Sequence, residues 1–340
     1  MKRYPLILLV ILVSATFFTF KFGHQLTNTY EKAFSAQVQA SLSNTKLKEI
    51  NVLNETKVSL LFVGDIMLSR GVAGQIKKNN PDYPFLLAAD ITQEADLAFG
   101  NLEGPISSRG EKQGSIYSFR ADPSVVEGLK FAGFDILSLA NNHIFDYGST
   151  ALLDTISYLG ENNIDSVGAG KYFSEANQPV IKEIKNTKIA FLAYTNLYPR
   201  SLAAEEETPG ISLFELEGIK KNIHQLKEIK KADIVIISLH WGEEYQNRSN
   251  EAQQKIAHGL AEAGADLIIG HHPHVIQEIE FYKGSWIAYS LGNFIFDQSF
   301  SPETMEGLAL SVDIKNKEIS KIQPLRVRIN NTFQPEIVKL

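Results

Sequence analysis

A repeated alternation between short apolar runs and polar or glycine-containing clusters, which starts at Val58, constrains the fold of this chain more than any other feature. Each run is bounded by residues that break regular structure and shows little polar alternation. Runs of this kind are typical of strands that are buried on both faces. We therefore expect buried strands in the segments VSLLFVGD, ADLAFGNLEG, FDILSLANNH, KIAFLAYTN, ADIVIISLHWG, ADLIIGHHPH and WIAYSLGNF.

Helical patterns lie between these runs. In the segment 122–133, Asp122 is suited to an N-cap, Pro123 to the first helical position and Gly133 to the end of the helix. Apolar residues also recur at helical spacing in the segments 149–163, 216–232 and 250–264. The order of strand, polar loop and helix predicts a layered α/β domain.

Nearly every expected strand ends in a side chain that can bind a metal ion. These side chains are Asp65, Asn101, Glu103, Asn141, Asn142, His143, His240, His271, His272, His274 and Asn293. Sites in α/β sheets form beyond the carboxyl ends of the strands, so we expect these groups to converge. The chain has no cysteine, and a set of carboxylate, amide and imidazole ligands suits Mn²⁺, Fe or Zn²⁺, singly or as a pair. The alternative is a hydrogen-bonded polar rim with one or two capping roles.

Three of the chain's eight histidines lie between positions 271 and 274, directly after an apolar run. Alternate residues of an extended chain point the same way, so His272 and His274 should share a face while His271 points to the other. Pro273 should stiffen the segment between them. The pair at 272 and 274 can then deliver two imidazoles to one ion or to two adjacent ions.

The N-terminal segment carries the signals of a membrane anchor. Lys2 and Arg3 precede an uncharged apolar stretch that ends at Lys21, and no small-residue cleavage motif follows closely. We expect an uncleaved signal anchor, with a cleaved signal peptide as the alternative, and we expect the rest of the chain outside the cytoplasm. The expected organisation is an anchor at 1–21, a polar stalk or linker at 22–57 and a folded domain at 58–340.

The charge distribution excludes one class of partner. The net charge is −6, and no stripe of basic residues is interleaved with aromatic residues. A nucleic-acid-binding surface normally shows such a stripe, so we expect no nucleic-acid partner.

The strand-end motifs, taken in order, are GDIMLSRGV, NLEGPI, LANNHIFDYG, HWGEEY, GHHPHVIQ and YSLGNFIFD. Over residues 58–297 this series resembles the CapA family of poly-γ-glutamate capsule biosynthesis proteins. The resemblance implies a membrane-anchored protein of polymer synthesis or export, with the other membrane subunits of the polyglutamate synthase as partners. It also implies an anionic polymer or phosphoester as substrate.

That family is similar in turn to the calcineurin-like metallophosphoesterases. This similarity implies a four-layer α/β/β/α sandwich with two divalent ions at the strand ends. The metal ligands it implies are Asp65, Glu103, Asn142, His240, His272 and His274. His143 would act as the acid that assists the leaving group, oriented by Asp146. The residues expected to contact these ligands or the substrate are Asn101, His271, Asn293 and Arg70.

Two positions depart from the metallophosphoesterase pattern. Met67 stands where the first motif has a histidine, and a thioether is a poor ligand for a hard divalent ion. Asn101 follows Gly100 where the pattern has a bridging aspartate, although Glu103 lies two residues further on. Two functions therefore remain open at this stage, a capsule assembly subunit and a metal-dependent hydrolase that acts on another substrate of the cell envelope.

An acidic protein that binds an anionic polymer needs local positive charge. The loops within or after the first two motifs supply cations that are either substrate contacts or solvated surface residues, namely Arg70, Arg109, Lys112 and Arg120.

Overall fold

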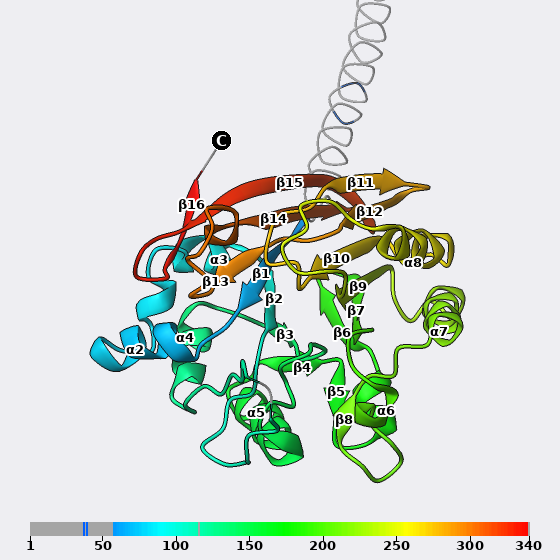
Figure 1. Cartoon of the computed structure of the whole chain (residues 1–340). Coiled ribbons are helices and arrows are strands. Elements are labelled where there is room, and N and C mark those ends of the chain that lie inside the picture. Colours follow the sequence, from blue (N-terminus) through cyan, green and yellow to red (C-terminus); the bar gives the residue numbers. More distant parts are fainter. Residues whose placement is uncertain (1–36, 38, 40–56, 115, 339–340) are drawn as a thin grey trace, which may run out of the picture. The chain divides into compact units, whose positions relative to one another are not determined.

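The computed structural model of the protein describes residues 37, 39, 57–114 and 116–338. The expected anchor at 1–21 lies outside the described residues, as does nearly all of the expected stalk at 22–57. No helix within the described part of the chain is long and apolar enough to cross a membrane. Lys57–Leu340 forms one compact unit, and the description below concerns that unit (Figure 1).

The larger of two main sheets, here called the first sheet, contains eight strands in the order β16-β15-β14-β1-β2-β3-β4, with β13 also paired to β1. β1 lies parallel to β2 and β13 and antiparallel to β14. The strand bounds are β1 Val58–Ile66, β2 Leu97–Leu102, β3 Ile136–Ser138, β4 Asp165–Val167, β13 Asn293–Ile295, β14 Glu306–Lys315, β15 Glu318–Ile329 and β16 Pro335–Val338.

The second sheet contains six strands in the order β11-β12-β10-β9-β7-β6. Its central strands β12, β10, β9 and β7 are mutually parallel, as expected for apolar runs separated by helices. The bounds are β6 Val180–Ile184, β7 Thr187–Thr195, β9 Ile234–His240, β10 Leu267–His271, β11 Ile279–Tyr282 and β12 Ser285–Ala288. A separate two-stranded sheet pairs β5, Ala169–Gly170, with β8, Gly210–Ile211.

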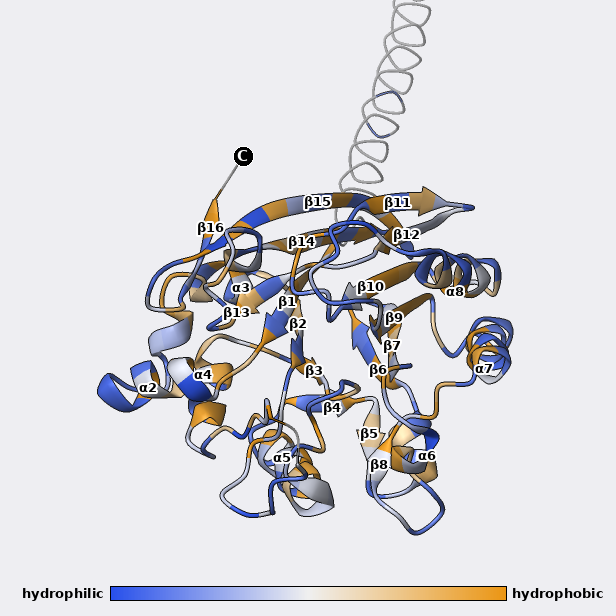
Figure 2. Cartoon of the chain, viewed as in Figure 1, coloured by the Kyte–Doolittle hydropathy of each residue, from blue (hydrophilic) through white to orange (hydrophobic). Residues whose placement is uncertain are grey.

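The two main sheets pack face to face through a buried apolar layer. Phe62 and Phe99 of the first sheet lie in this layer with Phe191, Ile236 and Ile269 of the second. The rings of Phe99 and Phe191 stack with their centroids 5.9 Å apart and so join the two sheets directly. Hydrophobic colour runs along β9 and β10 (Figure 2), as their buried positions require.

Helices cover the outer faces of both sheets. Apolar side chains of α2, α4 and α5 pack in one core cluster on the first sheet, and those of α7 and α8 pack in another on the second sheet. The chain therefore forms the layers α/β/β/α (Figure 1). The helix bounds are α2 Arg70–Lys78, α3 Ala89–Glu94, α4 Val125–Phe131, α5 Gly148–Glu161, α6 Phe173–Asn177, α7 Leu216–Glu228 and α8 Glu251–Glu262, with short 3-10 helices at Tyr83–Phe85, Arg200–Leu202 and Glu303–Met305.

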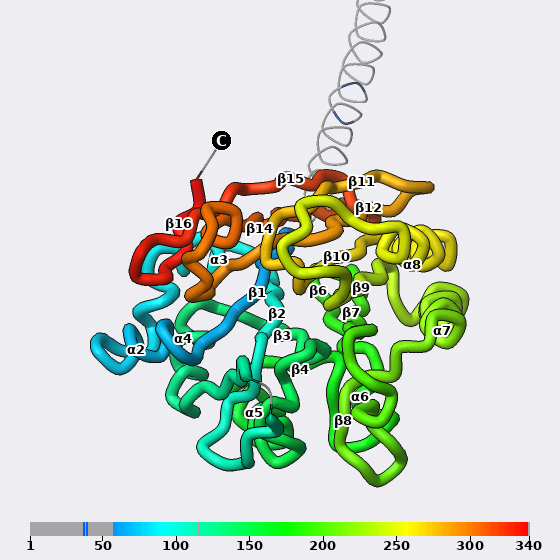
Figure 3. The backbone as a smooth tube through the Cα atoms, viewed as in Figure 1, coloured from blue at the N-terminus to red at the C-terminus, as the bar shows by residue number. Residues whose placement is uncertain are grey.

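The apolar run WIAYSLGNF forms two strands where the sequence analysis expected one. Its first half belongs to β12 in the second sheet and its last residues begin β13 in the first sheet. Between them the chain turns at Gly292, which has a φ of 67° and donates its N–H to the Ser290 hydroxyl. The backbone thus passes from one sheet to the other within residues 289–292 (Figure 3).

Helix α4 begins later than expected. The Asp122 carboxylate accepts hydrogen bonds from the backbone N–H and the hydroxyl of Ser124, at 2.9 and 2.7 Å. This local turn precedes the helix, which begins at Val125 and not at Pro123. Gly133 follows the helix with a φ of 77°, a conformation that suits glycine at a helix end.

Candidate metal centre

The carboxyl ends of strands from both sheets meet at one place. In the first sheet Asp65 of β1 pairs in register with Asn101 of β2 and with Asn293 of β13. In the second sheet His240 at the end of β9 pairs with His271 at the end of β10. All five side chains are buried. The structure therefore brings the polar strand ends together, as the sequence analysis expected.

Asp65 lies at the middle of this cluster. Its Oδ1 accepts a hydrogen bond from Asn101 at 2.8 Å and lies 3.4 Å from His271 Nδ1. Its Oδ2 lies 3.3 Å from His274 Nδ1 and accepts the backbone N–H of His272 at 3.3 Å. Burial opposes ionisation, but the contacts with His271 and His274 hold the pKa of Asp65 well below its usual value. Asp65 is therefore an anion with neighbours on both of its oxygens.

Glu103 has a buried carboxylate with no hydrogen-bond partner among the described residues. Its Oε1 lies 3.7 Å from His274 Nε2 and 3.6 Å from His143 Nε2. Burial raises the pKa of Glu103 to about 7. A buried carboxylate without a partner is costly, so this arrangement suits a cation held between the carboxylate and the imidazoles. Asp65, Glu103 and His274 can in fact each place a ligand atom within 4.8 Å of the other two.

His240 and His272 supply neutral imidazoles. Burial lowers the pKa of His240 well below its usual value, and burial together with the charge of His274 lowers that of His272 to about 3. His240 Nε2 lies 2.8 Å from the amide oxygen of Asn142, while His272 Nδ1 lacks a hydrogen-bond partner within the described part of the chain. The centroids of the His240 and His272 rings lie 4.9 Å apart. Neutral imidazole is the form that binds a metal ion.

His274 lies between the carboxylates of Asp65 and Glu103 and a third acidic residue, Glu244. Burial lowers its pKa, but the negative charge of Glu103 and the contact with Asp65 outweigh burial and raise the pKa to about 9. Its Nδ1 also lies 3.0 Å from the amide oxygen of Asn293. Glu244 can place a carboxylate oxygen within 4.8 Å of ligand atoms of His272 and His274. The sequence analysis missed Glu244, although its position in the motif HWGEEY was the available signal.

His271 does not follow the expected alternation. His272 and His274 have φ values of 96° and 57°, so the segment is not extended and the side chains do not alternate along it. His271 is fully buried beside Asp65 at the same site, and neither of its ring nitrogens has a hydrogen-bond partner among the residues described. The prediction that His271 points away from the other two histidines was therefore wrong.

His143 is held beside Glu103 by two contacts. Its Nδ1 lies 2.8 Å from Asp146 Oδ2, which also accepts the backbone N–H of Phe119 at 2.7 Å. The ring of Phe119 stacks on the imidazole with centroids 4.0 Å apart. Asp146 is thus placed to orient the imidazole of His143.

A cavity of about 710 Å³ opens beside this cluster, and we call it the site pocket. Its wall includes Asn142, His143, Glu244 and His274 from the candidate centre, together with Arg70. The other three cations named from the sequence do not line it. Of these, Arg109 pairs with Asp154, Arg120 lies over the ring of Tyr147, and Lys112 is exposed.

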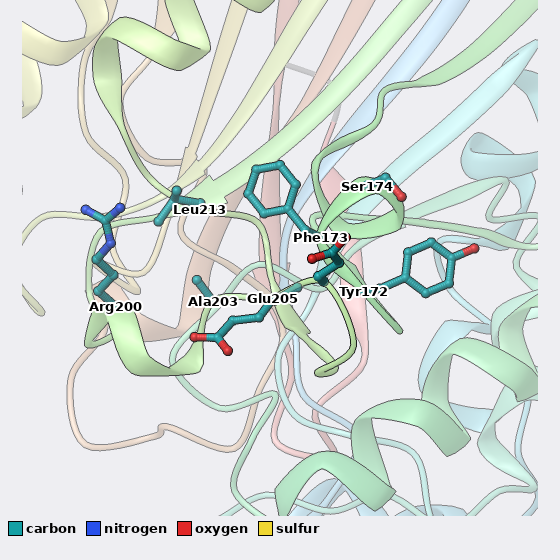
Figure 4. Close-up of a pocket in the computed structure, with 9 residues that line it drawn as sticks. Tyr172, Phe173, Ser174, Arg200, Ala203, Glu205 and Leu213 are labelled. Carbon is teal, nitrogen blue, oxygen red and sulfur yellow. The ribbon is translucent and has the colours of Figure 1, made fainter.

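A second cavity, of about 600 Å³, involves a different part of the chain. Tyr172, Phe173, Arg200, Glu205 and Leu213 surround it (Figure 4). It includes none of the strand-end residues, so it does not belong to the candidate metal centre.

Comparison with known proteins identifies the family. The family model described as "Bacterial capsule synthesis protein PGA_cap" matches residues 59–298. The chain belongs to this family. A capsule biosynthesis protein CapA of Bacillus anthracis is 36% identical over 251 residues, which cover 72% of this chain and 61% of the relative. A PGA biosynthesis protein CapA of Bacillus subtilis is 33% identical over 294 residues, covering 86% of this chain and 77% of the relative.

Solved structures confirm the fold class. A hypothetical protein from Thermus thermophilus has a TM-score of 0.51 and 17% identity, with coverage of 79% of this chain and 98% of that chain. A putative 5'-nucleotidase from Staphylococcus aureus has a TM-score of 0.50 and 14% identity, covering 83% of this chain and 54% of that chain. This PGA_cap protein thus has a mixed α/β fold that is similar to the folds of these solved structures.

The two departures from the metallophosphoesterase pattern have different structural outcomes. Met67 is fully buried, and its sulfur accepts hydrogen bonds from the backbone N–H and the hydroxyl of Ser69. Its sulfur is therefore occupied by Ser69 and is not among the proposed metal ligands. Asn101 donates to Asp65, while Glu103 brings a carboxylate to His274. The centre of this PGA_cap protein therefore retains carboxylate and imidazole groups that fit a divalent ion.

Proposed function

We propose that this chain is a membrane-anchored, extracytoplasmic protein of poly-γ-glutamate capsule synthesis or export, and that it works through a divalent metal site. Its family and its two Bacillus relatives support the capsule role. The observation that carries the metal site is the buried Glu103 carboxylate, which has no hydrogen-bond partner in the described structure and faces His143 and His274.

The residues that would hold the metal come from both sheets. Asp65, Glu103 and His274 form one group, whose ligand atoms lie within 4.8 Å of one another. The other proposed ligands are Asn142, His240 and His272. Two divalent ions, Mn, Fe or Zn, would supply Lewis acidity and stabilise negative charge that develops on a substrate oxygen.

His143 has a separate role in this proposal. Asp146 holds its Nδ1, which leaves Nε2 on the side of Glu103 and the site pocket. A proton carried on Nε2 would pass to a leaving-group oxygen, a contribution of typically ~10² to 10⁴ in rate. This His143–Asp146 pair also favours the second candidate function, a metal-dependent hydrolase that acts on a phosphoester or on another substrate of the cell envelope.

The location and partners follow from the N-terminal sequence and the family. Lys2 and Arg3 before an apolar run support a single-pass anchor with the folded domain outside the cytoplasm. The proposed partners are the other membrane subunits of the polyglutamate synthase, and nucleic acid is not among them. Protease added to wall-stripped cells should digest the folded domain, and a protected soluble protein would contradict this location.

Complementation of a capsule-deficient strain tests the function. Wild-type protein should restore poly-γ-glutamate, while Asp65→Ala and His143→Ala should not. His258→Ala is the matched control, because His258 stacks on Tyr282 and binds Glu280 outside the centre.

The pattern of results separates the two roles. If His143→Ala restores full polymer production and Asp65→Ala does not, the metal site is structural and the protein is an assembly subunit. If both variants behave like wild type, the strand-end cluster has no part in the function and the metal proposal fails.

A further inference from the structure

We propose that Arg70 binds one oxyanion group of the substrate, a carboxylate or a phosphate, in the site pocket, and that Asp297 positions its guanidinium. This inference rests on the proposed function, because it assumes an anionic substrate at the candidate centre. Within the described part of the chain, Arg70 is the one lysine or arginine that lines this pocket.

The Arg70 guanidinium is held on several sides. It pairs with Asp297, whose second carboxylate oxygen accepts the backbone N–H of Gly71 at 2.8 Å. It lies 4.6 Å above the ring of Phe119 and 5.7 Å from that of Phe296. Such stacking on aromatic faces suits a planar guanidinium and not an ammonium group. The group is therefore fixed in place while 34% of the Arg70 side chain stays exposed.

Donors remain for a ligand. A guanidinium carries five N–H donors, and among the described residues only Nη2 of Arg70 is hydrogen-bonded, to Asp297. A surface ion pair whose only task was to fasten α2 would need neither the aromatic support nor the position on a pocket wall. Free donors in a fork geometry match the two oxygens of a carboxylate or phosphate.

The backbone at Arg70 is also unusual. Its φ is 48°, in the left-handed region that residues other than glycine rarely adopt, and it is the first residue of α2. Strain of this kind persists where the surrounding structure holds a side chain in a required place. Arg70 and His143 both contact the ring of Phe119, so the bound oxyanion would lie close to the proposed acid.

The test measures anion binding by isothermal titration calorimetry on the full-length chain in detergent. The probes are inorganic phosphate and a short γ-linked glutamate oligomer, each titrated into metal-loaded and into metal-free protein. The variants are Arg70→Gln, Arg70→Lys and Asp297→Asn. Arg120→Gln is the matched control, because Arg120 also lies on an aromatic ring, that of Tyr147, but outside the pocket.

Arg70→Gln should weaken binding by roughly ten- to a hundred-fold, the effect of losing charge-assisted hydrogen bonds. Arg70→Lys should recover part of this loss because it restores the charge without the fork. Asp297→Asn should weaken binding less, because it frees the guanidinium without removing it, and Arg120→Gln should bind like wild type. If the protein binds phosphate and not the oligomer, the substrate is a phosphoester. If it binds the oligomer and not phosphate, the substrate is a carboxylate polymer.

Three results would overturn the inference: wild-type protein that binds neither probe, Arg70→Gln protein that binds as wild type does, or an equal loss in Arg120→Gln. Circular dichroism and bound metal should be unchanged in Arg70→Gln, and if this variant does not fold, Arg70→Lys and Asp297→Asn decide. A wild-type chain without bound metal contradicts the proposed metal site instead, and the metal-free titrations then still report on Arg70.

Discussion

The backbone N–H of Phe119 donates to the same Asp146 oxygen that holds His143 Nδ1, at 2.7 and 2.8 Å. The ring of Phe119 meanwhile covers the imidazole face. Phe119 therefore fixes both the partner and the plane of His143. A residue between two motif loops thus holds the orientation of the proposed acid from the wall of the site pocket.

We expect Phe119→Leu to lower function more than stability. The substitution keeps most of the buried volume, so it should cost less than about 1.5 kcal/mol of unfolding free energy, but it removes the stacked face. Polymer production in the complemented strain and thermal unfolding of the purified protein measure the two effects. Phe134→Leu is the control, since Phe134 is equally buried and contacts Phe85 and Phe294 instead. Equal losses of polymer in both variants would refute a specific role for Phe119.

Metal analysis tests the histidine pair directly. Purified wild-type protein should contain bound divalent metal, and the double substitution of His272 and His274 by Ala should remove much of it, since both are proposed ligands. Elemental analysis after purification without chelator gives the measurement, and His258→Ala should retain the wild-type content. Protein that holds no metal even after reconstitution would favour a hydrogen-bonded polar rim.

Glu103→Gln should change stability in opposite directions with and without metal. In metal-free protein the buried carboxylate lacks a hydrogen-bond partner in the described structure and has only the longer contacts with His143 and His274, so a neutral amide should be equal in stability or better, by up to about 3 kcal/mol. In metal-loaded protein the loss of a charged ligand should lower the unfolding temperature, because metal binding stabilises only the folded state. Thermal unfolding in the presence of chelator and of excess Mn²⁺ measures both. The same sign under both conditions would contradict a ligand role.

Gly270→Ala should be strongly destabilising because of the backbone. A Cβ at Gly270 would lie 1.8 Å from the carbonyl oxygen of Tyr289, which also accepts the indole N–H of Trp241. We expect a loss of more than about 3 kcal/mol by denaturant unfolding, in the range of severe overpacking. Gly160→Ala in α5 is the control, since a Cβ there meets nothing within 4 Å, and it should stabilise by roughly 0.5–1 kcal/mol. Similar unfolding curves for the two variants would count against this close approach.

Much of the fold could be predicted because its central strands are buried on both faces. The runs that became β1, β9 and β10 are largely apolar, and their polar ends mark the candidate site. β14 and β15 were missed because their side chains are only partly buried and their sequence lacks a continuous apolar run. β12 and β13 were read as one strand because the residues between them, 289–292, are uncharged and include no proline, even though the two strands belong to different sheets.

The candidate site was predictable in membership and less so in geometry. Asp65, Glu103 and His274 could be named because each follows an apolar run. Glu244 was missed, because only its position in the motif HWGEEY pointed to it, and an exposed acidic residue in a loop looks like an ordinary solvated one. The orientation of His271 could not be predicted, because it depends on the positive φ angles of His272 and His274. No local pattern in the sequence predicts positive φ angles for histidine.

The crossing of the chain between β12 and β13 has a mechanical consequence. Asp65 belongs to one sheet and His240 to the other, so any sliding of the sheets past each other would change the separation of the proposed ligands. The connector at 289–292 has one end in each sheet and ties them together beside this seam, where Gly292 accepts the backbone N–H of Asp65. The Phe99–Phe191 stack also joins the two sheets and so resists the same sliding, which makes the stiffness of the interior between the sheets a determinant of the spacing of the proposed ligands.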